Sequence, residues 1–408
     1  MNILVFEDAL VAQLHPITVS RPAYAITCAS YRLIDFLQQL DGPIVANVRS
    51  YLQAIQKLDF PNFKTKLDSG NEWTLVVNAR LAPTRSNYGR LKELFSSDAP
   101  TVIVDDGSVA IAVVKTESLT GEELQTVLAN VSNDDAATTE NCLFKFPHDV
   151  IRENMDCFND NMNLRLESGK YTEVANGVFS STKVELSSDV KFDTHDGPIV
   201  FEKNVSFGPF SFLRGPVYIG ENCKVNEHAS IKDAVSLAHT IKAGGEIEGA
   251  VIEAYSNKQH HGFLGHSYLG SWINLGAGTC NSDLKNTYGM VNIDYGSGKT
   301  STGMQFVGCA IGDYAKTAIN TSIFTGKMIG VGSMLYGFVT TNVPSFVNYA
   351  KSFGQMSGMP ASVLVTTQKR MFGRRKVQQR PEDIQLINDM FELTAHERPE
   401  LSTDPITF

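Results

Sequence analysis

The sequence predicts two folded parts in series: an α/β domain with a mostly parallel, doubly wound sheet, and a parallel β-helix built from hexapeptide repeats. The first prediction rests on short apolar runs that alternate with helical patterns along roughly the first 180 residues. The second rests on aliphatic residues that recur every six positions from Phe201 onward. A change of composition over residues 180–196 marks the transition between the two parts.

Length and charge limit the classes of function. A chain of 408 residues is long enough for two or three domains, and 42% hydrophobic residues can build a sizeable core. The formal net charge of -9 argues against a protein that binds a nucleic-acid backbone, which needs a basic face. A small anionic substrate remains possible, because a few local basic residues can hold a phosphate.

The cysteines and the N-terminus predict a cytoplasmic protein. No C-x-x-C pair or clustering suggests disulfides, so we expect reduced, mostly buried thiols. The chain opens with a short apolar run followed by Glu7 and Asp8, which is unlike a signal peptide. We find no window with the eighteen or so apolar residues that a membrane span requires. The six cysteines are Cys28, Cys142, Cys157, Cys223, Cys280 and Cys309.

The first part contains short β-branched runs that read as strands buried on both faces. We expect these strands at residues 3–6, 43–46, 74–77 and 101–104. Helical patterns lie between or after them, at residues 31–40, 51–58 and 149–166.

The second part has a period of six, which neither a helix nor an alternating strand produces. In a triangular solenoid each flat face is one short strand, and one aliphatic residue per face points into the core. The positions fall on three registers: Phe201, Phe207, Leu213, Ile219, Val225, Ile231 and Leu237; then Phe263, Leu269 and Leu275; then Ile311, Thr317, Ile323, Ile329 and Leu335.

Two segments depart from the repeat. Residues 280–306 are polar and read as a loop inserted into the solenoid, where such folds often carry binding residues. After Leu335 we expect a cap on the last coil and a helical tail that includes residues 381–393. A basic run at residues 368–376 is more often a solvated face than a site, although it could help to hold phosphates. The predicted domains are therefore 1–180, 190–343 and 344–408.

Three segments carry a resemblance to a known family: YSNKQHHGFLG at 255–265, WINLGAGTCNSDLKN at 272–286 and IGDYAKTAINT at 311–321. They resemble the bifunctional N-acetylglucosamine-1-phosphate uridyltransferase/glucosamine-1-phosphate acetyltransferase family, and more narrowly its divergent branch of sugar nucleotidyltransferase-like proteins. The resemblance implies a Rossmann-like nucleotidyltransferase domain followed by a left-handed parallel β-helix. It also implies acetyl-CoA or another acyl-CoA as donor, and a homotrimer.

The resemblance places the acyl-transfer site around His260. His260, four residues before Leu264-Gly265, matches the family's general base, with His261 as the alternative one residue later. An amine that attacks a thioester must lose a proton, and a near-neutral imidazole can accept it. We expect the two histidines to lie on one strand, so that only one of them faces the site. If His260 is instead structural, it is a polar residue on a solenoid face.

The other family positions follow from the same alignment. Asn274 matches the asparagine that contacts substrate, and Ala277 the residue whose N–H helps to hold the developing oxyanion. Gly276 and Gly278 are expected to let the ligand approach the backbone. Asn281 begins the element that follows Gly-Ala-Gly-Thr, two residues earlier than usual.

Two departures bear on the acceptor. Phe263 stands where the family has a tyrosine, and Glu248 lies near the expected phosphate-binding lysine. Lys285, or Lys258 beside the histidines, is the expected replacement for the lost positive charge. The acceptor is therefore predicted to be an amino-sugar phosphate or a nucleotide sugar, not necessarily glucosamine-1-phosphate.

The N-terminal domain lacks the groups that nucleotidyl transfer needs. A glycine-rich loop and a metal-binding aspartate would be expected, but the first strand is followed by the glycine-free residues 7–14 and the third by Asn78-Ala79-Arg80. The segment TVSRP at 18–22 resembles the divergent branch. Arg21, Asn78 and Arg80 are the weak candidates for nucleotide contact, with Mg²⁺ needed only if this domain is active.

Three hypotheses remain from the sequence. The first is acyl-CoA-dependent N-acylation of an amino-sugar phosphate or nucleotide sugar by the β-helix. The second is nucleotidyl transfer to a sugar-1-phosphate by the N-terminal domain, with the β-helix as a trimerisation scaffold. The third is a non-catalytic protein that binds nucleotide sugars or supports assembly. None involves nucleic acid or a membrane.

Overall fold

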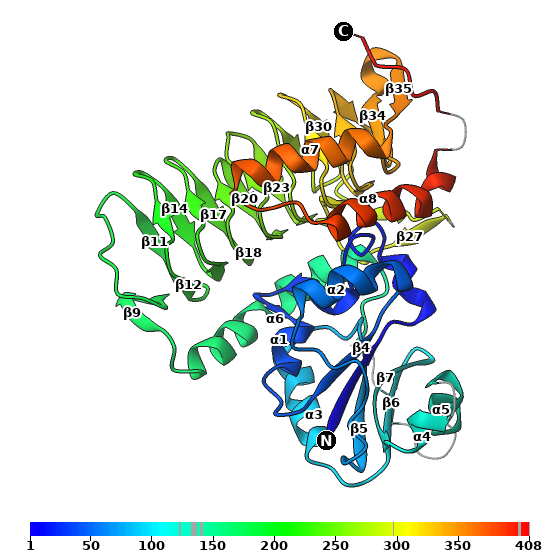
Figure 1. Cartoon of the computed structure of the whole chain (residues 1–408). Helices are drawn as coiled ribbons and strands as arrows, with labels where there is room; N and C mark the ends of the chain where they lie inside the picture. The colour runs from blue at the N-terminus through cyan, green and yellow to red at the C-terminus, as the bar shows by residue number, and fades with distance from the viewer. Residues whose placement is uncertain (122–123, 132–136, 139–141, 297, 399–400, 408) are drawn as a thin grey trace. The chain divides into compact units, whose positions relative to one another are not determined.

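The computed structural model describes residues 1–121, 124–131, 137–138, 142–296, 298–398 and 401–407 (Figure 1). The chain packs as two units. Unit 1 contains Met1–Leu14, Arg21–Ile26 and Tyr31–Phe146. Unit 2 contains His15–Ser20, Thr27–Ser30 and Pro147–Phe408.

Unit 1 is built on a six-stranded sheet of order β4-β1-β5-β7-β6-β8, which confirms the Rossmann-like α/β prediction. β1 is parallel to β4 and β5, whereas β7 is antiparallel to β5 and β6. The sheet is therefore mixed, because Asp106 and Gly107, both with positive φ, turn β6 back into a hairpin. The strands are β1 (Asn2–Phe6), β4 (Ile44–Asn47), β5 (Trp73–Asn78), β6 (Thr101–Asp105), β7 (Ser108–Lys115) and β8 (Ala137–Thr138).

The helices of unit 1 are short. The predicted helix at 31–40 begins as strand β3 (Tyr31–Arg32) and is helical only over α1 (Leu33–Leu37). The helix at 51–58 is confirmed as η3 (Ser50–Leu52) followed by α2 (Gln53–Asp59). The others are η1 (Ala9–Leu14), η2 (Ala23–Ala25), α3 (Arg85–Phe95), α4 (Ser118–Gly121) and α5 (Leu124–Val131).

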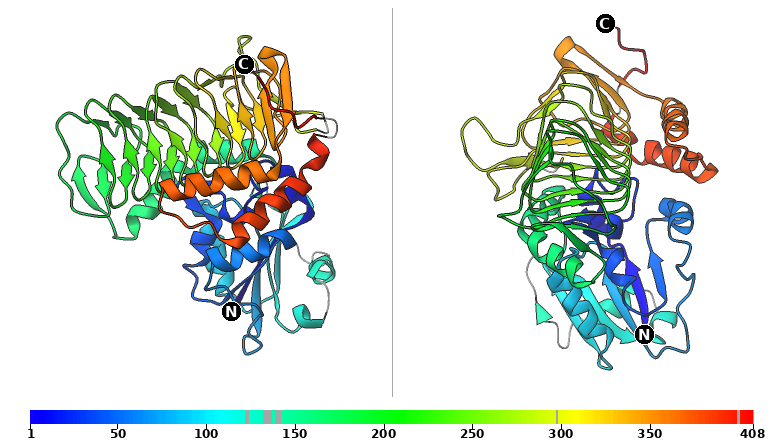
Figure 2. Two further views of the ribbon diagram at one scale, coloured as in Figure 1. Left: turned by 45° about the horizontal axis from the view of Figure 1, so that its top comes forward. Right: turned by 90° about the vertical axis from the view of Figure 1, so that its left-hand side faces the viewer.

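Unit 2 contains the predicted parallel β-helix, whose successive coils stack along one axis (Figure 2). The first face contains the strands β10 (Val178–Ser180), β12 (Ile199–Phe201), β15 (Val217–Ile219), β18 (Val235–Leu237), β21 (Val251–Ile252), β24 (Tyr268–Leu269), β28 (Cys309–Ile311) and β31 (Lys327–Ile329), with β9 (Thr172–Ala175) antiparallel at its edge.

The second face contains β11 (Lys191–Asp193), β14 (Phe212–Arg214), β17 (Ser230–Lys232), β20 (Glu246–Glu248) and β23 (Phe263–Gly265), and continues as β25 (Cys280–Asn281), β30 (Ser322–Ile323) and β33 (Phe338–Val339). The third face contains β13 (Ser206–Phe207), β16 (Lys224–Val225), β19 (Lys242–Ala243) and β22 (Asn257–Lys258), and continues as β29 (Lys316–Thr317), β32 (Met334–Leu335), β34 (Val347–Ala350) and β35 (Gln355–Gly358). Bridges from Asn274 to Asn257 and Lys316 join the two parts of this face.

The solenoid core follows the predicted repeat except in one place. The first register is inward from Phe201 to Leu237, and the third from Ile311 to Leu335. Phe263 was predicted to be in the core, but Leu264 occupies that position and the Phe263 side chain lies on the outer side. The step from Leu264 to Leu269 is five residues instead of six, which shifts the register.

The remaining segments of unit 2 are additions to the solenoid: a hairpin, helix α6 and a helical tail. The insertion after β25 forms a hairpin of β26 (Asn292–Asp294) and β27 (Lys299–Ser301). Helix α6 (Pro147–Glu167) confirms the helix predicted at 149–166. The tail forms η4 (Lys351–Phe353), α7 (Ala361–Arg374), α8 (Pro381–Leu393) and η5 (Ala395–Glu397), and β2 (Thr27–Cys28) also belongs to this unit.

Packing divides the chain near residue 146 instead of near 180. Helix α6 belongs with the solenoid, since Asn154 donates a hydrogen bond to the carbonyl of Ala234 at 2.7 Å. None of the described helices is long and apolar enough to cross a membrane.

Candidate functional site

The candidate acyl-transfer residues gather on one corner of the β-helix, between its third and second faces. His260 and His261 lie in the turn that joins β22 to β23, and Gly276–Thr279 form the equivalent turn one coil later. The bridge between Asn257 and Asn274 fixes an offset of 17 residues between these coils, so His260 stacks on Ala277. The structure therefore brings together His260, Asn274 and Ala277, which lie up to 17 residues apart in the sequence.

The two histidines have different surroundings. Both are exposed and lie in the turn, so the expectation that they share one strand was wrong. The Gln259 side-chain amide donates to Nε2 of His260 at 3.1 Å. His261 is tied to the next coil, because Gly278 N–H donates to its carbonyl at 3.1 Å and its ring lies against Gly278. The ring of His260 therefore has a side chain as its partner, the half-buried Gln259.

The turn below the histidines has one uncommitted amide. Gly276 N–H donates to Oγ1 of Thr317, Gly278 N–H to His261, and Thr279 N–H to Gly276. In the described part of the chain, the Ala277 N–H has no acceptor. An N–H group held by the backbone beside a histidine can stabilise negative charge on a carbonyl oxygen.

The glycines of this turn have a structural reason of their own. A Cβ on Gly276 would lie 2.6 Å from the backbone of Ala318, and Gly278 has φ +75°. Coil stacking therefore requires both glycines, whatever ligand approaches them. Their predicted role in ligand approach is not needed to explain them.

Asn274 belongs to a polar row on the third face. Its Oδ1 accepts a hydrogen bond from Nδ2 of Asn257 at 3.4 Å, and Oδ1 of Asn257 accepts from Arg375 at 2.6 Å. The side chain of Asn274 is half-buried and adjoins the histidine corner. It is the predicted substrate residue whose position fits contact with an acceptor.

Lys258 points into the solenoid core and not toward substrate. It is 2% exposed, and its Nζ donates to the carbonyls of Gly244 at 3.0 Å and His260 at 2.6 Å. Burial lowers the pKa of Lys258 to about 8. This lysine supports the histidine corner from inside, which argues against its predicted contact with substrate.

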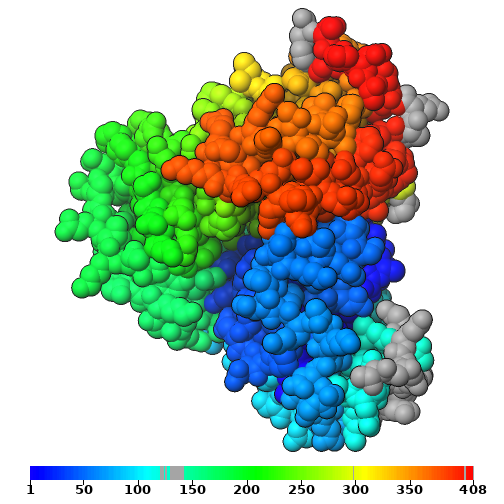
Figure 3. All heavy atoms as spheres, viewed as in Figure 1, coloured from blue at the N-terminus to red at the C-terminus, as the bar shows by residue number. Residues whose placement is uncertain are grey.

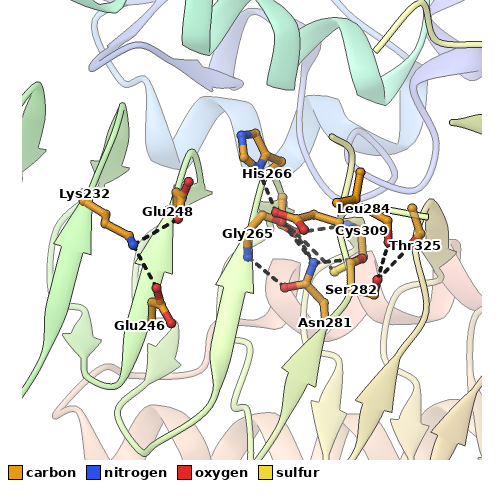
Figure 4. A network of polar contacts seen from close by, with 12 residues as sticks. Lys232, Glu246, Glu248, Gly265, His266, Asn281, Ser282, Leu284, Cys309 and Thr325 are labelled. Atoms are coloured by element: carbon orange, nitrogen blue, oxygen red, sulfur yellow. Dashed lines mark hydrogen bonds and ion pairs between the residues drawn. The ribbon is translucent and has the colours of Figure 1, made fainter. Parts of the chain in front are cut away.

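Asn281 is also engaged by the fold. It is 5% exposed, and its carboxamide accepts from Gly265 N–H at 2.8 Å and donates to the Gly265 carbonyl at 3.0 Å (Figure 4). Its predicted substrate contact is therefore not supported by its packing. Lys285 lies in the insertion, where its Nζ donates to the Met290 carbonyl at 3.0 Å.

A lysine from the preceding coil neutralises the charge of the Glu248 carboxylate. Nζ of Lys232 lies 2.9 Å from Glu246 and 3.3 Å from Glu248, between the two carboxylates (Figure 4). The lysine is thus present on this face, but its charge is paired. Phosphate binding on the second face is not favoured.

A histidine–carboxylate pair, not predicted from the sequence, lies at the base of the insertion. Nδ1 of His266, which is labelled in Figure 4, lies 2.8 Å from Oδ2 of Asp283. The imidazole stacks on Phe306 at 5.3 Å between ring centroids. Asp283 and Phe306 lie at the two ends of the insertion, so His266 closes its base. The nearness of Asp283 to the Gly-Ala-Gly turn was the available signal, but His266 precedes it by 17 residues.

An ion pair lies beside the carboxyl ends of strands β1 and β5 in unit 1. Oδ2 of Asp8 lies 2.7 Å from Arg80, whose side chain is 1% exposed, and Asn78 donates to the same oxygen at 2.8 Å. Burial raises the pKa of Asp8, but the hydrogen bonds and charge of Arg80, with Asn78, hold it below its usual 3.8. The predicted nucleotide contacts Asn78 and Arg80 are therefore occupied by Asp8.

A second ion pair stands beside the first. Glu7 is nearly buried and lies 3.0 Å from Arg49, whose guanidinium also donates to the carbonyl of Arg21 at 2.8 Å. Parallel sheets bind nucleotides at the carboxyl ends of their strands. Here that edge presents two carboxylates directly after β1, where a phosphate would need hydrogen-bond donors.

Comparison with known proteins agrees with the two-part architecture. Residues 3–169 match the family model described as sugar nucleotidyl transferase. The chain is 24% identical over 320 residues to the bifunctional protein GlmU of Bartonella quintana, covering 74% of this chain and 61% of that protein. It is 27% identical over 169 residues to a bifunctional sugar-1-phosphate nucleotidylyltransferase/acetyltransferase of Sulfurisphaera tokodaii, covering 41% of each.

Two solved structures are similar to about half of the chain. One is a putative acetyltransferase from Bacillus cereus, with 10% identity, a TM-score of 0.27, and coverage of 50% of this chain and 98% of that one. The other is a UDP-N-acetylglucosamine acyltransferase from Francisella novicida, with 17% identity, a TM-score of 0.29, and coverage of 52% and 85%.

The similarity of sequence extends over both units, although the chain spans only about six tenths and four tenths of the lengths of these two curated relatives. The matched N-terminal segment and the parallel β-helix correspond to the two parts that the resemblance predicted. The chain therefore resembles, at low identity, the bifunctional sugar nucleotidyltransferase/acetyltransferase proteins.

Proposed function

We propose that this protein is a sugar-nucleotide-pathway transferase whose β-helix transfers an acyl group from an acyl-CoA to the amine of an amino-sugar phosphate or nucleotide sugar. One observation carries the proposal. His260 stacks on Ala277, whose N–H has no acceptor within the described residues, and Asn274 adjoins the same corner.

The reaction needs three tasks that these residues can perform. The acyl donor supplies a thioester carbonyl: the C–N bond forms, the C–S bond breaks, and coenzyme A leaves as a thiol after taking up the proton that the histidine accepts. His260 would accept a proton from the attacking amine at Nε2 once the acceptor displaces the Gln259 amide. The Ala277 N–H would donate to the carbonyl oxygen as negative charge develops on it. Asn274 would orient the acceptor through its carboxamide.

One protomer is sufficient to hold the N–H group that would contact the acyl donor. Its free N–H is held by the stacked coils, because the carbonyl of Ala277 accepts from Asn320 N–H at 2.7 Å. A donor fixed in this way needs no reorganisation when charge develops. The two histidines are exposed, however, so a single protomer leaves one side of the site open to solvent.

A homotrimer would supply the missing wall. Large apolar side chains are exposed on the coils that follow the site: Ile319 is 69% exposed, Phe338 58% and Phe353 57%. Ile319 occupies the corner position one coil after Ala277. A second copy packed on this apolar patch (Ile319, Phe338 and Phe353) would bury it and enclose the corner.

We expect light scattering to give a mass three times the 44.7 kDa of one chain. The double variant Ile319→Glu/Phe338→Glu should dissociate, because each substitution buries a charge in the interface. Phe210→Glu is the control, since Phe210 is 64% exposed but lies on an early coil. A monomeric mass for the wild type, or trimers for the double variant, would contradict the proposed interface.

Nucleotidyl transfer by unit 1 is the second candidate, supported by the family match over residues 3–169. We expect magnesium-dependent pyrophosphorolysis of nucleotide sugars to stay at the level of a protein-free control. The reason is the pair of carboxylates, Glu7 and Asp8, at the strand edge where phosphates would bind. Pyrophosphate-dependent release of a nucleoside triphosphate well above that control would restore this candidate. A non-catalytic role is the remaining alternative, and it predicts neither activity.

A further inference from the structure

Four cations gather on the third face of the β-helix, away from the ion pairs of the second face. Lys224 and Lys242 are neighbours in the parallel pairing of β16 and β19. Arg374 ends helix α7 and Arg375 follows it. The guanidinium of Arg375 donates to Asn257, which is paired with Lys242 in the next strand.

The four charges act on one another. Burial, and then the charges of Arg375, Arg374 and Lys224, lower the pKa of Lys242. Burial and the charge of Arg374 likewise lower the pKa of Arg375. A like charge lowers the pKa of a cation only when it lies nearby, so the two arginines lie close to Lys242.

Helix α7 holds the two arginines in place. It lies along the coils of the solenoid in every view (Figures 1 to 3). The ring of Phe372 packs on Trp272 at 4.4 Å between centroids, and Gln368 donates to the hydroxyl of Tyr314 at 3.1 Å. The end of the helix is therefore fixed beside Lys242, and the arginines cannot simply move away from the lysines.

No described carboxylate neutralises this cluster. The exposed lysine Lys203 pairs with Glu221 at 3.2 Å, and Lys232 pairs with two glutamates. None of Lys224, Lys242, Arg374 and Arg375 has an ion pair among the described residues. Four unpaired cations held together in a chain of net charge -9 form a local site for an anion.

We propose that Lys224, Lys242, Arg374 and Arg375 bind a diphosphate group, such as the one that joins a nucleoside to a sugar. Two lysines and two arginines can place donors on both phosphates. Arginine suits phosphate because its planar guanidinium donates two parallel hydrogen bonds. A single phosphate would leave part of the cluster unpaired.

One row of side chains on the third face connects the cluster with the candidate acyl-transfer site. Lys242, Asn257 and Asn274 are successive members of the polar row on the third face. Adjacent strands are about 4.8 Å apart, so Lys242 and Asn274 are separated by about 10 Å. This step rests on the proposed function: an acceptor whose diphosphate lies on the cluster would extend its sugar toward Asn274. A nucleotide sugar in this position is distinguished from the diphosphate of the coenzyme A donor by competition: a nucleotide sugar that binds the cluster should not be displaced by coenzyme A.

The test is calorimetric titration of the full-length protein with inorganic pyrophosphate, inorganic phosphate, a nucleoside diphosphate and the matching nucleoside. We expect pyrophosphate and the nucleoside diphosphate to bind, and phosphate and nucleoside to bind at least tenfold more weakly. The double variant Lys242→Gln/Arg375→Gln should weaken pyrophosphate binding by at least tenfold, because each charged hydrogen bond contributes on the order of tenfold in affinity. Tighter binding of the nucleoside diphosphate than of pyrophosphate would indicate that the protein also contacts the nucleoside.

The matched control is Lys170→Gln/Lys183→Gln, which removes two exposed charges of unit 2 that lie outside the cluster. The proposal is wrong if both double variants weaken binding equally, or if neither does. The proposed acyl transfer is tested separately, because His260→Ala should leave pyrophosphate affinity unchanged. Loss of acyl transfer without pyrophosphate binding would keep that function and remove this site.

Discussion

Replacement of His260 by alanine is expected to lower the rate of acyl transfer by about 10²–10⁴-fold, the usual contribution of a positioned general base. His260 is exposed and occupies the position of Ala277 on the preceding coil, so the substitution removes a proton acceptor without opening a cavity in the core. The loss should appear in kcat, while the affinity for coenzyme A should hardly change. The measurement is thiol release from acetyl-CoA across a panel of amino-sugar acceptors that the wild type acylates.

His261→Ala is the matched control in the same turn. The main-chain hydrogen bond from Gly278 to the carbonyl of His261 survives the substitution, but the ring contact with Gly278 is lost. We expect a much smaller effect, with unchanged thermal unfolding. If His261→Ala is the inactive variant, the base is one residue later than the resemblance implies. Wild-type activity in both variants would remove the histidine corner from the mechanism.

The solenoid could be predicted because its core obeys a simple rule that one inward residue per face is aliphatic. The rule fails at Lys258, which fills an inward position between Ile252 and Leu264, each six residues away. A lysine is rarely buried, and its amine is accommodated here only because two corner carbonyls accept its protons. The repeat was therefore lost over that coil, and Phe263 was placed in the core in error.

The resemblance named the residues of a candidate site but could not give the orientation of their side chains. It assigned His260, Asn274 and Ala277 to one acyl-transfer site, and the stacking of the coils brings these three positions close together. It could not show that Asn281 turns inward to the Gly265 backbone. Residue type alone also could not show that Arg375, more than a hundred residues away, donates to Asn257. These contacts depend on tertiary packing, which sequence spacing does not encode.

In unit 1 the sequence showed which groups are missing but not what replaces them. A glycine-free stretch after β1 predicted that a phosphate loop is absent, and the structure has the short helix η1 there. Arg80 was considered a phosphate contact because its partner was unknown. Asp8 and Arg80 are 72 residues apart, so only the pairing of β1 with β5 reveals the ion pair.

The ion pair is expected to matter for stability, and its removal should have a large effect on unit 1. Asp8→Ala leaves the guanidinium of Arg80 buried without its carboxylate, which should cost about 3–5 kcal/mol in the free energy of unfolding at neutral pH. The readout is urea unfolding followed by the fluorescence of Trp73 in a Trp272→Phe background. Glu72→Ala, which breaks an exposed pair with Lys115, should cost less than about 1 kcal/mol.

The effect of Asp8→Ala should depend on pH in a defined direction. Because the folded pKa of Asp8 lies below 3.8, the pair stabilises the protein fully above that value and is lost as the pH falls through the lowered pKa. The difference in unfolding free energy between the wild type and Asp8→Ala should therefore be constant from neutral pH down to about 5 and should shrink at lower pH. Equal stability of Asp8→Ala and Glu72→Ala at neutral pH would show that Arg80 does not depend on Asp8. The strand edge of unit 1 would then be open to a phosphate after all.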